Sequence, residues 1–157
     1  MRVGRKTVRC NDLHYPCGRA AWNGYGAYLS QGGEATGLPV KPCYMYALTR
    51  EGRKPPMVHV RQSIYSLLEP RKKKGNVVNL LGYFSPLVDD CELYDLLHGV
   101  GVKTIHEISR CKDYEEYQTM SEANFNLVLH PEARFAAEDF HDRLKIPYIE
   151  LRRLYQI

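Results

Sequence analysis

Two observations about residues 76–157 predict an α/β fold built on a four-stranded parallel sheet. Short apolar runs recur at Asn76–Gly82, Val102–Ile108, Asn124–His130 and Pro147–Leu151. Helical patterns separate these runs, and strands that alternate with helices form parallel sheets through right-handed crossovers. We therefore expect a Rossmann-like sheet flanked by helices, with an irregular N-terminal region ahead of it.

The first run and the helix after it are the clearest elements. Asn76–Gly82 is apolar on both sides and closes on a glycine, which is typical of a strand buried on both faces. The helix is expected over Asp89–Gly99, with Asp89 or Asp90 as the N-cap. Three leucines at helical spacing would form its apolar stripe: Leu93, Leu96 and Leu97.

Two further helices are expected between the remaining strands, at Lys112–Met120 and Pro131–Leu144. Pro131 suits the first position of its helix, where the backbone N–H that proline lacks would have no partner anyway. The apolar residues of this helix are expected to face the sheet; they are Phe135, Ala136, Phe140 and Leu144.

Residues 1–57 are expected to be irregular, consistent with the remnant of a preceding domain. Six glycines lie in Gly18–Gly37 and four prolines in Pro39–Pro56. Glycine and proline at this density interrupt helices and interior strands. Only Ala20–Leu29 has a helical pattern in this region.

The Rossmann-like domain is expected to occupy residues 58–157. It would open on a helix at Val58–Glu69, with apolar residues on one side and Arg61 and Gln62 on the other. Pro70 would end that helix.

The charges of the chain are divided between its two halves. The 157 residues carry a formal net charge of +4. Residues 1–74 hold 14 Lys and Arg against 4 Asp and Glu, and residues 75–157 hold 8 against 14, so the halves carry +10 and −6. Such asymmetry indicates an acidic partner for the basic half, either a nucleic acid or other parts of a larger assembly.

The basic residues favour a protein-facing or solvated surface over a nucleic-acid site. No RNA-binding or helix-turn-helix motif accompanies them, although a nucleic-acid module would still be revealed by retention on DNA at low salt. The residues concerned are Arg50, Arg53, Lys54, Arg61 and Arg71–Lys74. We therefore do not expect a nucleic-acid partner.

The sequence also favours a cytoplasmic location without a membrane partner. No run of about 18 apolar residues is present, and no apolar run follows the basic residues at the N-terminus. The five cysteines are odd in number and irregularly spaced, which indicates reduced thiols. Cys10 and Cys17 flank His14, but the long spacing and the missing second pair argue against zinc.

A candidate site follows if the strand order is 2-1-3-4. Ligands of open parallel sheets bind beyond the carboxyl ends of strands, where the winding direction reverses. That point would bring together Tyr83, Ser85, Asp89 and His130. His130 would precede a helix N-terminus, which favours anions; a histidine that only bonds a loop carbonyl is the alternative. No glycine-rich dinucleotide or phosphate-binding motif is present.

A series of short motifs runs through the same half in a fixed order. It comprises Asn76–Gly82, Asp89–Leu93, Gly99–Val102, Ser121–Val128, Ala136–His141 and Ile146–Ile149. With these motifs, residues 76–157 resemble the middle domain of nitrogenase component 1 proteins. That family includes the molybdenum–iron protein subunits, their cofactor-assembly scaffolds and dark-operative protochlorophyllide reductase. Thr36–Cys43 resembles the end of the preceding domain.

The resemblance implies an oxidoreductase domain that walls a metallocluster or tetrapyrrole cavity in a larger reductive complex. His130 stands where the catalytic subunit has its cluster-binding cysteine, which makes it the candidate metal ligand. Tyr83 and Ser85 would face the same cavity, and His59 would correspond to a cavity histidine. The catalytic residues remain unassigned.

The same resemblance implies the partners and cofactors. A homologous component 1 subunit and an ATP-dependent iron–sulfur reductase would be the partners, and an iron–sulfur or metal cluster would be the cofactor of the full complex. This chain lacks most of the first family domain and all of the third. We therefore expect no cluster bound tightly to it and no catalysis by it alone. The alternative is a module that binds a small anionic ligand without redox chemistry.

Overall fold

The chain divides into two units, Met1–Val40 and Lys41–Ile157. A computed structural model describes residues 29, 31–43 and 54–151. In the first unit residues 31–36 are helical, and the expected helix at Ala20–Leu29 lies outside the described residues apart from Leu29. All the elements described below belong to the second unit.

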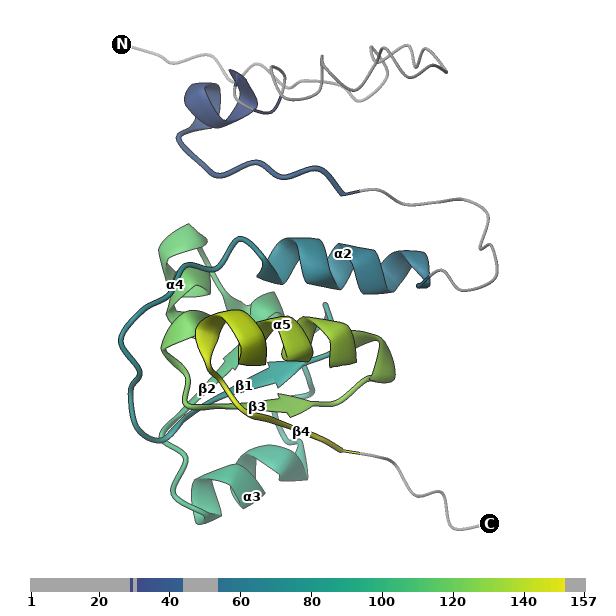
Figure 1. Cartoon of the computed structure of the whole chain (residues 1–157). Coiled ribbons are helices and arrows are strands. Elements are labelled where there is room, and N and C mark those ends of the chain that lie inside the picture. The colour runs from purple at the N-terminus through teal and green to yellow at the C-terminus, as the bar shows by residue number, and fades with distance from the viewer. Residues whose placement is uncertain (1–28, 30, 44–53, 152–157) are drawn as a thin grey trace. The chain divides into compact units, whose positions relative to one another are not determined.

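The second unit contains the parallel sheet that the sequence predicts (Figure 1). Its strands are β1 (Val77–Leu81), β2 (Thr104–Glu107), β3 (Phe125–Val128) and β4 (Tyr148–Glu150). They run in the order β2-β1-β3-β4, and every neighbouring pair is parallel. The predicted fold class is confirmed, and the strand order is the one on which the candidate site was conditional. All five residues of β1 are buried, as expected of a central strand.

Helices cover the two faces of the sheet unequally. On one face lie α2 (Pro56–Tyr65), α4 (Tyr114–Gln118) and α5 (Arg134–Leu144), and on the other lies α3 (Glu92–Gly99) (Figure 1). Three short 3₁₀ turns complete the unit; they are η3 (Ile108–Arg110), η4 (Thr119–Glu122) and η5 (Pro131–Ala133). No helix of the described residues is long and apolar enough to cross a membrane.

The main hydrophobic core lies under α2 and α5. Tyr65 and Phe140, from these two helices, stack at 5.2 Å between ring centroids above Leu81 and Val128 of the central strands. A second, smaller cluster lies under α3, where Leu93 and Leu97 pack on the sheet. The core therefore sits mainly on one side of the sheet.

Three details of the helices differ from the sequence-based expectations. Cys91, not Asp89 or Asp90, is the N-cap of α3, because the Asp89 carboxylate pairs with Arg110 at 2.7 Å. Leu96 is 59% exposed, and Phe135 is only half-buried. Arg61 was expected on the polar side of α2 but is only 7% exposed. It lies three residues after Val58 and four before Tyr65, so the three residues share the buried side of the helix.

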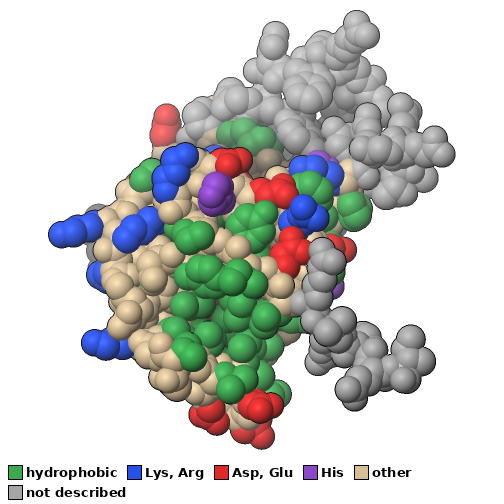
Figure 2. Space-filling view, turned by 60° about the horizontal axis from the view of Figure 1, so that its bottom comes forward, with side chains coloured by type: hydrophobic (Ala, Val, Ile, Leu, Met, Phe, Trp, Pro, Cys, Tyr) green, Lys and Arg blue, Asp and Glu red, His purple; other side chains and the backbone are tan. Residues whose placement is uncertain are grey.

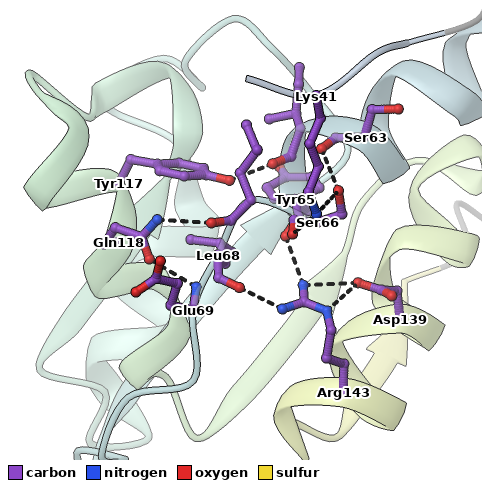
Figure 3. A network of polar contacts seen from close by, with 12 residues as sticks. Lys41, Ser63, Tyr65, Ser66, Leu68, Glu69, Tyr117, Gln118, Asp139 and Arg143 are labelled. Carbon is purple, nitrogen blue, oxygen red and sulfur yellow. Dashed lines mark hydrogen bonds and ion pairs between the residues drawn. The ribbon is translucent and has the colours of Figure 1, made fainter. Parts of the chain in front are cut away.

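The C-terminal end of α2 is held by side chains from α4 and α5 (Figure 3). The hydroxyl of Tyr117 donates to the carbonyl oxygen of Ile64, and Gln118 Nε2 donates to that of Leu67 at 3.0 Å. Arg143 donates to the carbonyl oxygens of Tyr65 and Leu68 and pairs with Asp139 at 3.0 Å. The carbonyls that a helix end leaves without partners are thereby satisfied.

A pair of buried asparagines joins the two central strands. Asn79 of β1 and Asn126 of β3 are opposite each other in the register and have no exposed surface. Asn79 Nδ2 donates to Asn126 Oδ1 at 2.7 Å and to the carbonyl oxygen of Met120 at 2.9 Å. A register shift of one residue would separate the two amides, so the pair favours this pairing of the strands.

Candidate functional site

The carboxyl ends of β1 and β3 meet where Gly82 approaches His130. Gly82 has a φ of 140°, which L side chains rarely adopt. A Cβ on Gly82 would lie 2.7 Å from the backbone nitrogen of His130 and 2.8 Å from its Cβ. Glycine is therefore required for the two strand ends to come together at the point where the winding direction reverses.

The ring of His130 is fixed by the turn that follows it. His130 is the N-cap of η5, and its Nδ1 accepts a hydrogen bond from the backbone N–H of Glu132 at 3.3 Å. A neutral imidazole whose Nδ1 accepts carries its proton on Nε2. The His130 side chain is 36% exposed, so its Nε2–H is available as a hydrogen-bond donor.

Tyr83 connects His130 to an open pocket. Its ring meets the ring of His130 edge to face, with 5.7 Å between the centroids. Tyr83 and Ser85 line a pocket of about 660 Å³ together with mostly apolar residues. The remaining lining residues are Pro86, Leu87, Val88, Cys91, Leu93, Leu129 and Leu151. The structure thus brings Tyr83 together with both Ser85 and His130.

His59 and Asp89 occupy other positions. His59 lies on α2, two residues before Arg61, and residues two apart on a helix do not share a face. Since Arg61 reaches the strand ends, His59 projects from a different side of α2. Asp89 is exposed and paired with Arg110 at 2.7 Å.

Arg61 is a central residue of this site that sequence reasoning assigned to the surface. Its guanidinium donates to the carbonyl oxygen of Gly82 through Nε at 3.1 Å and Nη2 at 2.8 Å. Nη1 pairs with the Glu132 carboxylate at 2.6 Å, and the guanidinium carbon lies 5.0 Å from the ring centroid of Phe84. Arg61 therefore ties α2 to the loop after β1 and to the turn after His130.

The pocket loop is anchored from β2 by Glu107. One carboxylate oxygen of Glu107 accepts from the backbone N–H of Leu87 at 3.1 Å, and the other accepts from the hydroxyl of Tyr94 and from Arg110. Burial, and next the contact with Glu107, raise the pKa of Tyr94. Glu107 follows Ile105 by two on the strand, so its place on the α3 face could have been inferred from strand alternation.

The described residues do not fit a metal centre held by this chain alone. In residues 29, 31–43 and 54–151 no group of three or more His, Cys, Asp or Glu could hold a metal ion. Metal-bound histidines almost always donate their other ring N–H, whereas Nδ1 of His130 accepts a hydrogen bond. Ligation through Nε2 would require His130 to give up that hydrogen bond. The assignment of His130 as a metal ligand stays a prediction.

Comparison with known proteins gives one match. No curated protein and no solved structure matches the chain. A family model described as nitrogenase component 1 type oxidoreductase matches residues 46–157, which include all the strands of the sheet. The chain therefore belongs to the nitrogenase component 1 type oxidoreductase family.

Proposed function

We propose that this chain forms one wall of a metallocluster or tetrapyrrole cavity in a larger reductive complex. The observation that supports the proposal is the approach of Gly82 to His130, whose ring contacts Tyr83, a residue that lines an open pocket. Family membership supports an oxidoreductase domain. The carboxyl ends of parallel strands are also where such folds place ligands.

In this proposal the wall residues position a bound group through polar contacts. His130 donates through Nε2, and the hydroxyls of Tyr83 and Ser85 donate or accept. The apolar part of the pocket excludes water and strengthens these contacts. His59 belongs to the same wall only if a partner segment extends the cavity toward α2.

The remaining components come from partners. A homologous component 1 subunit would complete the cavity, and an ATP-dependent iron–sulfur reductase would supply electrons. A cluster, when bound to the complex, provides the redox chemistry. Because the described residues supply no set of metal ligands, the isolated chain is expected to be inactive.

Co-expression tests this proposal. The chain is produced anaerobically alone and together with a homologous component 1 subunit, and iron content and EPR spectra are measured. Iron and an EPR signal should accompany the complex and be absent from the chain alone. His130→Ala should change the EPR signal, whereas His141→Ala on α5 should leave it unchanged. Stoichiometric iron on the chain alone, or no complex, would contradict the proposal.

The pocket itself favours a second candidate, a module that binds a small ligand without redox chemistry. Its volume of about 660 Å³ suits a small molecule. Thermal-shift screening with anionic metabolites distinguishes the two functions. Stabilisation that is lost in both His130→Ala and Ser85→Ala would favour this candidate over the cavity wall.

A further inference from the structure

The face of the sheet that carries α3 is only partly covered by the described elements. Leu93 and Leu97 of α3 pack in the cluster that contains Val78 and Leu80 of β1. Toward the β4 edge the same face holds Ile149, which is 55% exposed and pairs in register with Leu127. Strand neighbours in register point to the same side, so Ile149 lies on the α3 side of the sheet.

The apolar residues on this side that are exposed or only partly buried are together called the open face. It consists of Val88, Leu93, Leu96, Leu129, Ile149 and Leu151. Four of these residues line the pocket that Tyr83 and Ser85 also line, and Leu151 directly follows the end of β4. Figure 2 shows hydrophobic side chains gathered in a band, with acidic side chains at its lower end. Apolar patches of this kind mark interaction sites.

The width of the open face suits one α-helix. Strands lie about 4.8 Å apart, so β1, β3 and β4 span roughly 10 Å. Packed helices lie about 8–10 Å apart, so a helix beside α3 would lie over β3 and β4. Parallel sheets are normally covered on both faces, which makes a helix the expected occupant.

The flank of α3 beside the open face is acidic. Tyr94 of α3 reaches Glu107 of β2, so the opposite flank, with Glu92 and Leu96, faces β3 and β4. Glu92 and the preceding Asp90 are exposed and make no ion pair with any described residue. A helix placed there would gain from Lys or Arg on the side toward α3.

We propose that the open face binds an amphipathic α-helix of a partner protein, with its apolar side on β3 and β4 and a basic flank along α3. The proposal does not rest on the cavity wall, because it requires neither a cluster nor a tetrapyrrole. The open face and the pocket beside Tyr83 share Val88, Leu93, Leu129 and Leu151, so a helix seated there and a ligand that fills the pocket would compete. The proposal also assigns a partner chemistry to the acidic half of the chain.

Binding of a designed peptide to the full chain tests the proposal. The probe is a fluorescein-labelled 18-residue peptide of Leu and Lys, with Leu at helical spacing, and the readout is fluorescence polarisation. Leu96→Ser with Ile149→Ser should weaken binding by about tenfold or more, as expected from the loss of buried apolar area. Asp90→Asn with Glu92→Gln should weaken binding by about threefold and reduce its salt dependence.

Matched variants and a second peptide provide the controls. Met57→Ser changes an exposed apolar residue on α2, and Glu69→Gln with Asp142→Asn changes acids away from α3; both should bind like the wild type. A peptide with Glu in place of Lys should bind at least about tenfold more weakly. Equal binding by both peptides, or equal loss in the control variants, would overturn the proposal. Concentration-dependent dimers abolished by Leu96→Ser with Ile149→Ser would overturn it in favour of a second copy.

Discussion

At the scale of single residues, Gly82 decides whether the strand ends can meet. Gly82→Ala would force a Cβ to within 2.7 Å of the His130 backbone nitrogen and hold alanine at a φ of 140°. We expect a loss of about 2–4 kcal/mol in the free energy of unfolding, from strain and overpacking together. Urea denaturation measures it, with Gly99→Ala as the control because nothing lies within 4 Å of a Cβ there. Equal stability of the two variants would contradict the geometry.

Arg61 is expected to be the most important buried ion of the site. Arg61→Met leaves the Gly82 carbonyl oxygen and the Glu132 carboxylate without their cation. A loss of about 2–4 kcal/mol in unfolding free energy is expected, since one partner of a buried pair is removed. Arg134→Met, which removes exposed ion pairs, should cost less than about 1 kcal/mol. The double variant Arg61→Met with Glu132→Gln should be more stable than Arg61→Met alone, because it no longer holds an unpaired carboxylate. Equal stability of the two variants would show that the Glu132 carboxylate does not need the Arg61 cation.

His106 makes the stability of the domain depend on pH. Burial lowers the pKa of His106 below its usual 6.5, so the unfolded chain binds a proton more readily than the folded one. Its stabilising contribution is therefore complete above pH 6.5 and is lost as the pH falls from 6.5 toward the folded-state pKa. Urea denaturation at pH 7.5 and 5.5 should show a smaller change for His106→Gln than for the wild type. His141→Gln, an exposed control, should behave like the wild type.

At the scale of elements, the central strands β1 and β3 were well predicted because they are short, mainly apolar runs. The outer strands β2 and β4 are more polar and were found from the apolar residues in and beside them. The helix ends were harder to predict, since capping depends on tertiary partners. Asp89 is a good N-cap by residue type, but Arg110, distant in sequence, pairs with it. The segment expected to be one helix at Pro131–Leu144 is a 3₁₀ turn followed by α5.

The asparagine pair between β1 and β3 is expected to act as a unit. Asn79→Leu leaves Asn126 Oδ1 buried without its donor and removes one of the two donors to the Met120 carbonyl oxygen, which keeps the N–H of Ala123. We expect it to lower the unfolding free energy by about 1–3 kcal/mol. Asn79→Leu with Asn126→Leu should lose clearly less than the sum of the single losses, because both amides are gone. Additive losses in urea denaturation would show that the two amides act independently.

At the scale of the whole molecule, the site was only partly predictable. The strand order, taken as a condition, was sufficient to bring Tyr83 to His130, and Tyr83 and Ser85 line one pocket. Arg61 and Glu107 were missed because a charged residue is normally assigned to the surface, although the spacing of Val58, Arg61 and Tyr65 marks one buried stripe. His59 lies on the same helix as Arg61 but not on the same side, and its place at the cavity stays a prediction.

The unequal covering of the sheet predicts where the second unit opens first. No residue of α3 is buried, whereas α5 buries Ala136, Ala137, Phe140 and Leu144. Local opening needs less free energy where fewer apolar contacts are lost. Native-state hydrogen exchange should therefore give α3 amides an opening free energy a few kcal/mol below that of α5 amides. Equal values in the two helices would mean that the second unit opens as a single cooperative body. The Leu and Lys peptide should raise the value for α3 specifically, because a helix on the open face covers Leu93 and Leu96.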